Sequence, residues 1–187
     1  MNQGHAELCS SRRWAQFIAD EVVPAALAGQ ELGARVLEIG PGYGAVTAVL
    51  ANHAVDVTAV EIDPQLAAAL RERFPMVRVV DGRGEALPFP DATFTTVLSF
   101  TMLHHVHSVA AQDALFAEAG RVLRTGGVFA GSDSIASPGL REFHHDDIYT
   151  PVDPSTLPGR LVPAGFGPVD VRTAPDGDWF SFTAIRA

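Results

Sequence analysis

The feature that most constrains the fold of this chain is a glycine-rich turn between a strand-like segment and a helix-like segment. Residues 35–39 form a short apolar run with the β-branched residues typical of a buried strand. Gly40, Gly42 and Gly44 follow at alternate positions, and a helical pattern continues over residues 45–53. Glycine tolerates positive φ and has no Cβ, and the first N–H groups of a helix are free to meet a ligand. The pattern therefore predicts a strand–turn–helix unit that brings the backbone close to a nucleotide-like ligand.

The charge balance argues against nucleic acid as a partner. The 187 residues include 13 basic and 22 acidic side chains, which gives a net charge of −9. Binding to a phosphate backbone depends on Lys and Arg, and the sequence shows no basic stripe. With 47% hydrophobic residues, the composition is that of a globular chain that can bury a sizeable core.

The sequence also predicts a cytoplasmic protein without a membrane span. Residues 1–5 lack the basic-then-apolar pattern of a signal peptide, and no apolar run approaches the roughly 20 residues of a spanning helix. Cys9 is the single cysteine, so no intrachain disulfide is expected. Its place near the terminus argues against a nucleophilic role. The oligomeric state is left open.

Strand-like and helix-like segments alternate along the chain. Strands are expected at residues 35–39, 56–63, 76–80, 94–100, 128–132, 169–172 and 179–185. Helices are expected at about residues 12–20, 45–53, 64–74, 108–122 and 154–164. The alternation predicts an α/β fold with a Rossmann-like, doubly wound, seven-stranded and mostly parallel sheet. The tight turn at residues 175–178 predicts that the last two strands form a C-terminal antiparallel hairpin.

The residue that ends the second expected strand points to a ribose. Glu61 lies 17 residues past Gly44, and a carboxylate there can accept two hydrogen bonds from ribose hydroxyls. Both a dinucleotide and an adenosyl ligand carry such a ribose, and Gly40 to Ala45 also satisfies a dinucleotide fingerprint. The alternative for Glu61 is an acid at the end of a strand that faces solvent.

Four blocks together resemble a class I S-adenosylmethionine-dependent methyltransferase of the small type-11-like family. They cover about residues 35–131, in the order and at the spacing typical of that family. The blocks are Val36-Leu37-Glu38-Ile39-Gly40-Pro41-Gly42-Tyr43-Gly44 at the cofactor turn, Val60-Glu61-Ile62-Asp63 at the ribose motif, residues 85–94 before the fourth strand, and residues 121–127 before the fifth strand.

The resemblance implies S-adenosylmethionine as the cofactor, S-adenosylhomocysteine as its product, and a set of cofactor-binding residues. The three glycines and Glu38 would hold the methionine part, Glu61 the ribose, and Ile62 the adenine face. Gly84 and Glu85 would lie beside the adenine edge, and Ser99 would face the cofactor with its backbone.

The sequence departs from the family pattern at two positions. Arg83 stands where the family commonly has an Asp that accepts from the adenine amine, and Arg has no acceptor. Asp81 could substitute if the loop bends. Thr95 stands where an acid usually starts the fourth strand.

Candidate catalytic and substrate residues follow the fourth and fifth strands. His104 and His105 lie in the loop after the fourth strand and are either a general base or a structural part of the cofactor loop. Phe143, His144 and Tyr149 are candidates for the wall of the acceptor pocket. Neighbouring histidines do not point the same way by default and no partner at ligand spacing is evident, so no metal site is expected.

We expect one domain over residues 1–187. Its parts are an N-terminal helical segment at 1–30, a cofactor-binding core at about 35–131, and a substrate-side loop with the hairpin at about 132–187. Residues 1–10 are expected to be loose.

Within these parts, Pro24 and Gly29 are expected to end the N-terminal helical region, and residues 133–155 to be irregular. The helix with Trp14 either covers a sheet edge or forms a lid over the cofactor, with Trp14 as the aromatic contact.

The predicted function is transfer of a methyl group from S-adenosylmethionine to an unidentified acceptor, which we expect to be a small molecule. A nicotinamide-dependent oxidoreductase is the first alternative. Pro41 in the turn, the Leu87-Pro88-Phe89 block and the lack of any Lys disfavour it. A non-catalytic adenosyl-ligand binder that acts through a protein partner is the second, and Arg83 favours it.

Overall fold

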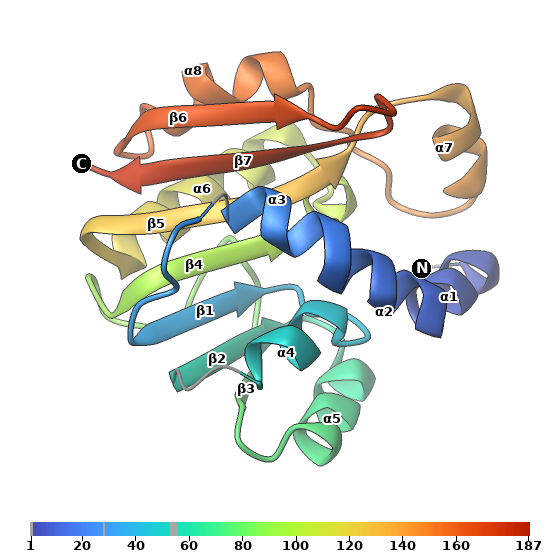
Figure 1. Cartoon of the computed structure of the whole chain (residues 1–187), viewed down its shortest axis with the longest axis horizontal. Coiled ribbons are helices and arrows are strands. Elements are labelled where there is room, and N and C mark those ends of the chain that lie inside the picture. Colours follow the sequence, from blue (N-terminus) through green and yellow to red (C-terminus); the bar gives the residue numbers. More distant parts are fainter. Residues whose placement is uncertain (1, 28, 53–55) are drawn as a thin grey trace.

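The fold is organised around a seven-stranded sheet with the strand order β3-β2-β1-β4-β5-β7-β6 (Figure 1). The computed structural model describes residues 2–27, 29–52 and 56–187. The strands are β1 (Arg35–Ile39), β2 (Asp56–Glu61), β3 (Arg78–Asp81), β4 (Phe94–Phe100), β5 (Leu123–Ser134), β6 (Phe166–Thr173) and β7 (Trp179–Arg186). Strands β1 to β5 pair in parallel, and β7 pairs antiparallel with both β5 and β6. The predicted fold class, including the antiparallel hairpin, is confirmed.

Helices cover both faces of the sheet. The helical elements are α1 (Gln3–Cys9), α2 (Arg12–Phe17), the π-helical η1 (Ile18–Val22), α3 (Val23–Leu27), α4 (Ala45–Leu50), α5 (Pro64–Arg73), the 3₁₀ turn η2 (Leu103–His105), α6 (Val109–Val122), α7 (Pro138–Phe143), the 3₁₀ turn η3 (Pro154–Thr156) and α8 (Leu157–Leu161). Because successive side chains of a strand point to opposite faces, each face has its own core. Apolar residues of η1, α3 and α4 pack with Val36 and Leu98 on one face, and those of α6 and α8 pack with Leu37 and Val97 on the other.

The N-terminus is ordered, so the prediction of a loose segment at residues 1–10 was wrong for the described part. Helix α1 begins after Asn2, whose side-chain oxygen accepts a hydrogen bond from the His5 N–H. The Asn2 amide also donates to the carbonyl oxygens of Phe143 (2.7 Å) and His145 (3.2 Å). Contacts to a segment more than 140 residues away hold this helix, and its own sequence carries no apolar period that would reveal them.

Helical backbone continues from Arg12 to Leu27, beyond the predicted end. Pro24 lies in the first turn of α3, where its missing N–H is tolerated, and the preceding turn widens so that the Val23 N–H donates to the Ile18 carbonyl. This run packs on one face of the sheet, where the Thr183 hydroxyl donates to the Ala26 carbonyl (2.9 Å). It therefore covers a face of the sheet and not a sheet edge, so the edge interpretation was wrong.

Other boundaries differ by a few residues. Strand β5 begins at Leu123, because Leu123 pairs with Phe94 before a bulge, so it starts earlier than the predicted residue 128. The segment predicted to be irregular contains α7, whose first turn is capped by the Ser137 hydroxyl. The last helix ends at Leu161. The helix predicted at residues 45–53, after the first strand, ends at Leu50, and residue 53 lies outside the described ranges.

Of the helices in residues 2–27, 29–52 and 56–187, none combines the length and the apolar character required to cross a membrane.

Candidate functional site

A cavity of about 270 Å³ opens at the carboxyl ends of β1, β2 and β4. This edge of a parallel sheet is where open α/β folds bind ligands. The glycine turn and the strand-end acids form one wall, and the N-terminal helices with Trp14 form another. Trp14 lines this cavity, and its role in a lid over the cofactor stays a prediction.

The three predicted glycines adopt the conformation that the turn requires. Gly40, Gly42 and Gly44 have φ of 68°, 54° and 76°, in the region that glycine favours over other residues. Gly44 stands at the N-cap of α4, and a Cβ there would lie 2.8 Å from atoms of Leu70 and Phe74. Gly40 and Gly42 line the cavity, whereas Gly44 starts the helix behind it.

Glu61 links the glycine turn to the end of β2. Its carboxylate is buried and accepts hydrogen bonds from the Gly42 N–H (2.9 Å) and the Asp63 N–H (3.0 Å). These two backbone donors fix the carboxylate in the cavity wall. The end of the second strand and the turn after the first are thus joined, as the sequence spacing predicts for a ribose-binding acid.

Glu38 is a second buried carboxyl group in the same wall. Burial raises its pKa from the ordinary 4.5 to about 7, and the nearby Glu61 charge acts in the same direction. The Thr47 hydroxyl donates to Glu38 Oε2 (2.7 Å) and opposes that rise. A carboxyl group with this pKa changes charge near neutral pH, and a cationic group placed beside it would favour the ionised form.

Four of the nine predicted cofactor residues, Gly44 among them, do not line the cavity. Gly84 is packed against Ile39 and Leu115, where a Cβ would lie 2.6 Å from the Leu115 side chain. Glu85 lies 3.4 Å from the Arg83 guanidinium, and Ser99 is buried within β4. Their roles at the cofactor stay predictions. Ile62, by contrast, lines the cavity and is 57% exposed, so its side chain is free to receive a flat ligand.

The two departures from the family pattern lie in different places. Arg83 pairs with Glu85, and Asp81 pairs with Arg71. Thr95 lies near the amino end of β4, where its hydroxyl accepts from the Arg35 N–H (3.0 Å) and donates to the Arg35 carbonyl (2.7 Å). Thr95 therefore ties β4 to the start of β1, at the end of the sheet opposite the cavity.

A second cavity of about 410 Å³ adjoins the first and shares His5, Cys9, Trp14 and Thr101 with it. Phe143 and His144 line this second cavity. Tyr149 stacks on His144 with 4.7 Å between the ring centroids. The three candidate acceptor-pocket residues therefore lie together.

The predicted histidine pair divides between the two cavities. His105 lines the first, and burial together with the neighbouring His104 and His5 lowers its pKa to about 3. His104 lines the second. Its Nδ1 contacts a carboxylate oxygen of Asp133, a fully buried residue near the end of β5, and its backbone N–H donates to the other oxygen (3.0 Å). Burial acts to lower the His104 pKa, but Asp133 outweighs it and the pKa is raised.

Sequence reasoning missed several residues of the site. Asp63, Thr101 and Met102 line the first cavity directly after β2 and β4, and Asp133 meets His104 near the end of β5. The sequence signal that could have found them is their position at the ends of the expected strands. Residues that end or follow parallel strands gather at the same edge of the sheet. Cys9 lines both cavities, but burial raises its pKa to about 11 and keeps it a thiol.

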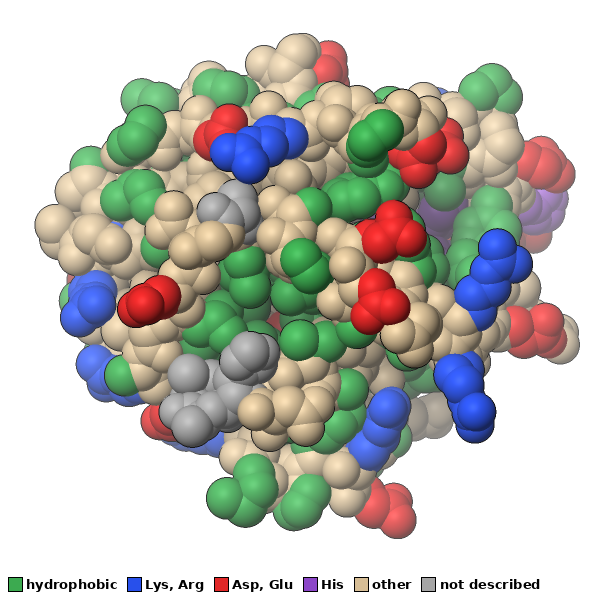
Figure 2. Space-filling model, in the orientation of Figure 1, with side chains coloured by type: hydrophobic (Ala, Val, Ile, Leu, Met, Phe, Trp, Pro, Cys, Tyr) green, Lys and Arg blue, Asp and Glu red, His purple; other side chains and the backbone are tan. Residues whose placement is uncertain are grey.

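Charged side chains are dispersed over the face shown in Figure 2, with acidic and arginine side chains interspersed. No continuous basic stripe crosses the described residues of that face. Such a surface offers no track for a phosphate backbone there.

Comparison with known proteins identifies the family. Residues 37–131 match the type-11 methyltransferase domain. A Mycolicibacterium smegmatis protein named "Probable S-adenosylmethionine-dependent methyltransferase" is 34% identical over 157 residues, which are 80% of this chain and 58% of that protein. A Mycobacterium tuberculosis protein of the same description is 32% identical over 162 residues, 83% of this chain and 56% of that protein. The chain thus spans a little over half the length of these curated relatives.

Solved structures agree on the fold. A Pyrococcus horikoshii protein superimposes with a TM-score of 0.78 and 17% identity, over 95% of this chain and 92% of that chain. At that identity the likeness concerns the fold alone. The match to more than half of the chain decides the family: the chain belongs to the type-11 methyltransferase-domain family of class I S-adenosylmethionine-dependent methyltransferases.

Proposed function

We propose that this protein transfers a methyl group from S-adenosylmethionine to an acceptor that enters from the second cavity. The observation that carries the proposal is the convergence of the glycine turn, Glu38 and Glu61 on one cavity at the carboxyl edge of the sheet. The names of the relatives support S-adenosylmethionine as the cofactor.

Each part of the cofactor has a fitting group in the wall. The glycine turn lets backbone approach the methionine part, and Glu38 would face its ammonium. Glu61 would accept from the ribose hydroxyls, and the exposed Ile62 side chain would pack on the adenine. Gly84 and Glu85 would lie beside the adenine edge, and Ser99 would face the cofactor with its own backbone.

The cofactor supplies a methyl group on a positively charged sulfur, which is already a strong electrophile. The protein then has to align the acceptor with that methyl group and exclude water. Trp14 and Thr101 line both cavities and so mark the border where the two ligands would meet. Methyl transfer to an unprotonated nucleophile needs no general base, so a base role for His104 or His105 is not part of this proposal.

A small-molecule acceptor fits the second cavity. Its volume of about 410 Å³ lies in the usual range of about 300–1,000 Å³ for small-ligand sites. Phe143 and His144 give its wall two aromatic side chains, and Tyr149 stacks on His144. The acceptor atom is not assigned.

Calorimetric titration with S-adenosylmethionine, S-adenosylhomocysteine and NADH, side by side, tests the proposal. We expect the two adenosyl ligands to bind and NADH not to bind. Binding of NADH alone would replace the proposal with the oxidoreductase alternative. A panel of small acceptors incubated with methyl-labelled S-adenosylmethionine then tests transfer, and cofactor binding without label transfer to any acceptor would favour the non-catalytic binder.

A further inference from the structure

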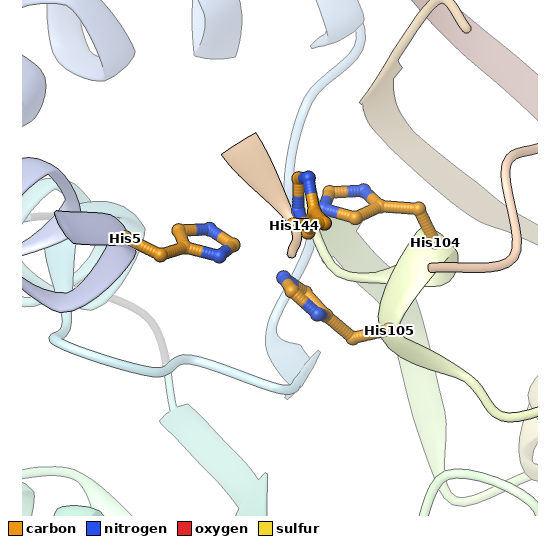
Figure 3. A group of neighbouring side chains, drawn as sticks. All are labelled: His5, His104, His105 and His144. Carbon is orange, nitrogen blue, oxygen red and sulfur yellow. The ribbon is translucent and has the colours of Figure 1, made fainter. Parts of the chain in front are cut away.

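Four histidines that are far apart in the sequence converge between the two cavities. His5 comes from α1, His104 and His105 from η2, and His144 follows α7 (Figure 3). One ring nitrogen of each lies within 4.8 Å of those of the other three. His5, His104 and His144 are buried, and His105 is half-buried.

The polar contacts of two rings leave one nitrogen of each available. His104 Nδ1 contacts Asp133, and His144 Nδ1 lies 2.7 Å from the Leu140 carbonyl oxygen, to which it can donate. These two contacts favour the tautomer that carries the proton on Nδ1, so Nε2 keeps its lone pair. His5 Nδ1 lies 3.5 Å from an Asp147 carboxylate oxygen, but it is buried and has no hydrogen-bond partner among the described residues. The Nε2 of His144 is buried and has no hydrogen-bond partner among the described residues.

The His104–Asp133 contact has the form that supports metal-binding histidines. Ligating imidazoles usually donate their second N–H to a carboxylate or a backbone carbonyl, which orients the ring and makes it a better ligand. His104 has the carboxylate and His144 has the carbonyl. Buried rings that face one another without donors leave polar atoms unsatisfied, which lowers stability unless a ligand binds those atoms.

The electrostatic surroundings keep most of the cluster neutral. Burial, reinforced by the neighbouring imidazoles, lowers the pKa of His5 to about 4 and that of His105 to about 3, and burial also lowers the pKa of His144. Neutral imidazole is the form that binds a metal ion, because its lone pair is free.

We propose that His5, His104, His105 and His144 form a site for a divalent transition-metal ion, and that Zn²⁺ is the ion that this set of ligands takes. Imidazole suits first-row transition ions, and Zn²⁺ accepts four nitrogen ligands in a tetrahedron at about 2.0–2.1 Å. Such a tetrahedron holds its nitrogens about 3.3 Å apart. The four ring nitrogens lie at most 4.8 Å apart, so binding would have to draw them together by up to about 1.5 Å.

The site joins three segments that otherwise meet through few polar contacts. Asn2 already connects α1 to the carbonyl oxygens of Phe143 and His145. The metal would hold α1, η2 and the end of α7 together and so fix the border between the cavities. The proposal does not depend on methyl transfer, since the ligands and their supports come from this chain alone.

The test uses the whole 187-residue chain without a histidine tag, freed of metal with a chelator and titrated with ZnCl₂ and separately with CoCl₂. We expect one Zn²⁺ per chain by calorimetry, and the intense visible absorption of tetrahedral Co²⁺. Failure to bind Zn²⁺ stoichiometrically, or a Co²⁺ spectrum of octahedral type, would overturn the proposal. Neither readout requires cofactor or activity, so the outcome is separate from that of the proposed function.

Matched variants identify the ligands. His5→Ala alters a short terminal helix outside both cores and should weaken Zn²⁺ binding at least about tenfold. His145→Ala is the control, because His145 adjoins His144 in the chain but its side chain is 66% exposed and outside the cluster.

Asp133→Asn should weaken Zn²⁺ binding about 10- to 100-fold and alter the Co²⁺ spectrum. Equal affinities for His5→Ala and His145→Ala contradict the assignment. Circular dichroism checks that each variant folds, and if Asp133→Asn does not, His5→Ala and the wild-type Co²⁺ spectrum decide.

Discussion

At the scale of single residues, Glu61 joins the glycine turn to the end of β2. Its two carboxylate oxygens each accept from a backbone N–H, one in the glycine turn and one at the start of α5. Both neighbours are donors, so the position requires an acceptor on each side. A ribose ligand would add further donors to the same group.

Glu61→Gln should therefore weaken binding of S-adenosylhomocysteine. Gln has nearly the same shape, but its NH₂ group would face the Gly42 or the Asp63 N–H, donor against donor. Losing a hydrogen bond to a charged group costs about 2–3 kcal/mol, which is roughly 30- to 150-fold in affinity. Calorimetry measures this. Asp56→Asn, at the other end of β2, is the control, and equal affinity of the two variants would remove Glu61 from the ribose role.

At the scale of elements, the glycine turn shows how backbone conformation and packing act together. Gly42 and Gly44 both have positive φ, but their surroundings differ. A Cβ on Gly42 would meet open space, whereas one on Gly44 would lie 2.8 Å from Leu70 and Phe74. The turn thus fits closely against α5 on one side and faces the cavity on the other.

Gly44→Ala should lower the free energy of unfolding more than Gly42→Ala does. Both variants carry the cost of a left-handed conformation, about 1–2 kcal/mol, and Gly44→Ala adds overpacking of about 1–3 kcal/mol. Gly42→Ala should instead act mainly on cofactor affinity, because its methyl group would point into the ligand's space. Denaturant unfolding and calorimetry on the two variants separate these effects, and equal loss of stability would contradict the packing assigned to Gly44.

At the scale of the whole molecule, the fold buries a carboxyl group whose ionisation lowers the free energy of unfolding. Glu38 is buried in β1, and its pKa in the folded state is about 7 against an ordinary value of 4.5. The pKa of Glu38 is higher in the folded state than in the unfolded state. The contribution of the neutral Glu38 carboxyl group to stability is therefore fully present below about pH 4.5 and is lost as the pH rises through about 7. The shift corresponds to about 3 kcal/mol between these limits.

Unfolding free energies of the ligand-free protein and of Glu38→Gln, measured from pH 5 to pH 8, should diverge. The wild type should lose stability relative to Glu38→Gln as the pH rises, by about 2–3 kcal/mol in all. Thr47→Val keeps Glu38 but removes the hydrogen bond that opposes its pKa rise, so the loss should move to higher pH. A constant difference between wild type and Glu38→Gln across this range would show that Glu38 does not titrate in it.

The strands of the sheet, its mostly parallel pairing and part of the cavity lining could be predicted from local sequence, whereas the strand order came from the structure. Apolar runs of the length of strands, the φ that alternate glycines allow, and the rule that parallel strands align their carboxyl ends are local or generic, so they placed Gly40, Gly42 and Glu61 together. Helix α1 could not be predicted, because the hydrogen bonds from Asn2 to the carbonyl oxygens of Phe143 and His145 join it to a distant segment of the chain. The extension of β5 to Leu123 depends on pairing with Phe94, which no local pattern encodes.

What the sequence by itself determined is the α/β sheet, the cofactor turn and the acid that ends β2, because each depends on a few residues that are neighbours in the chain. Only the tertiary structure decided which distant side chains meet. It placed Asp133 on His104 and brought His5 and His144 to the pair after β4. Their separations in sequence carry no ligand spacing, since α1, η2 and α7 approach one another only when the helices pack against the finished sheet.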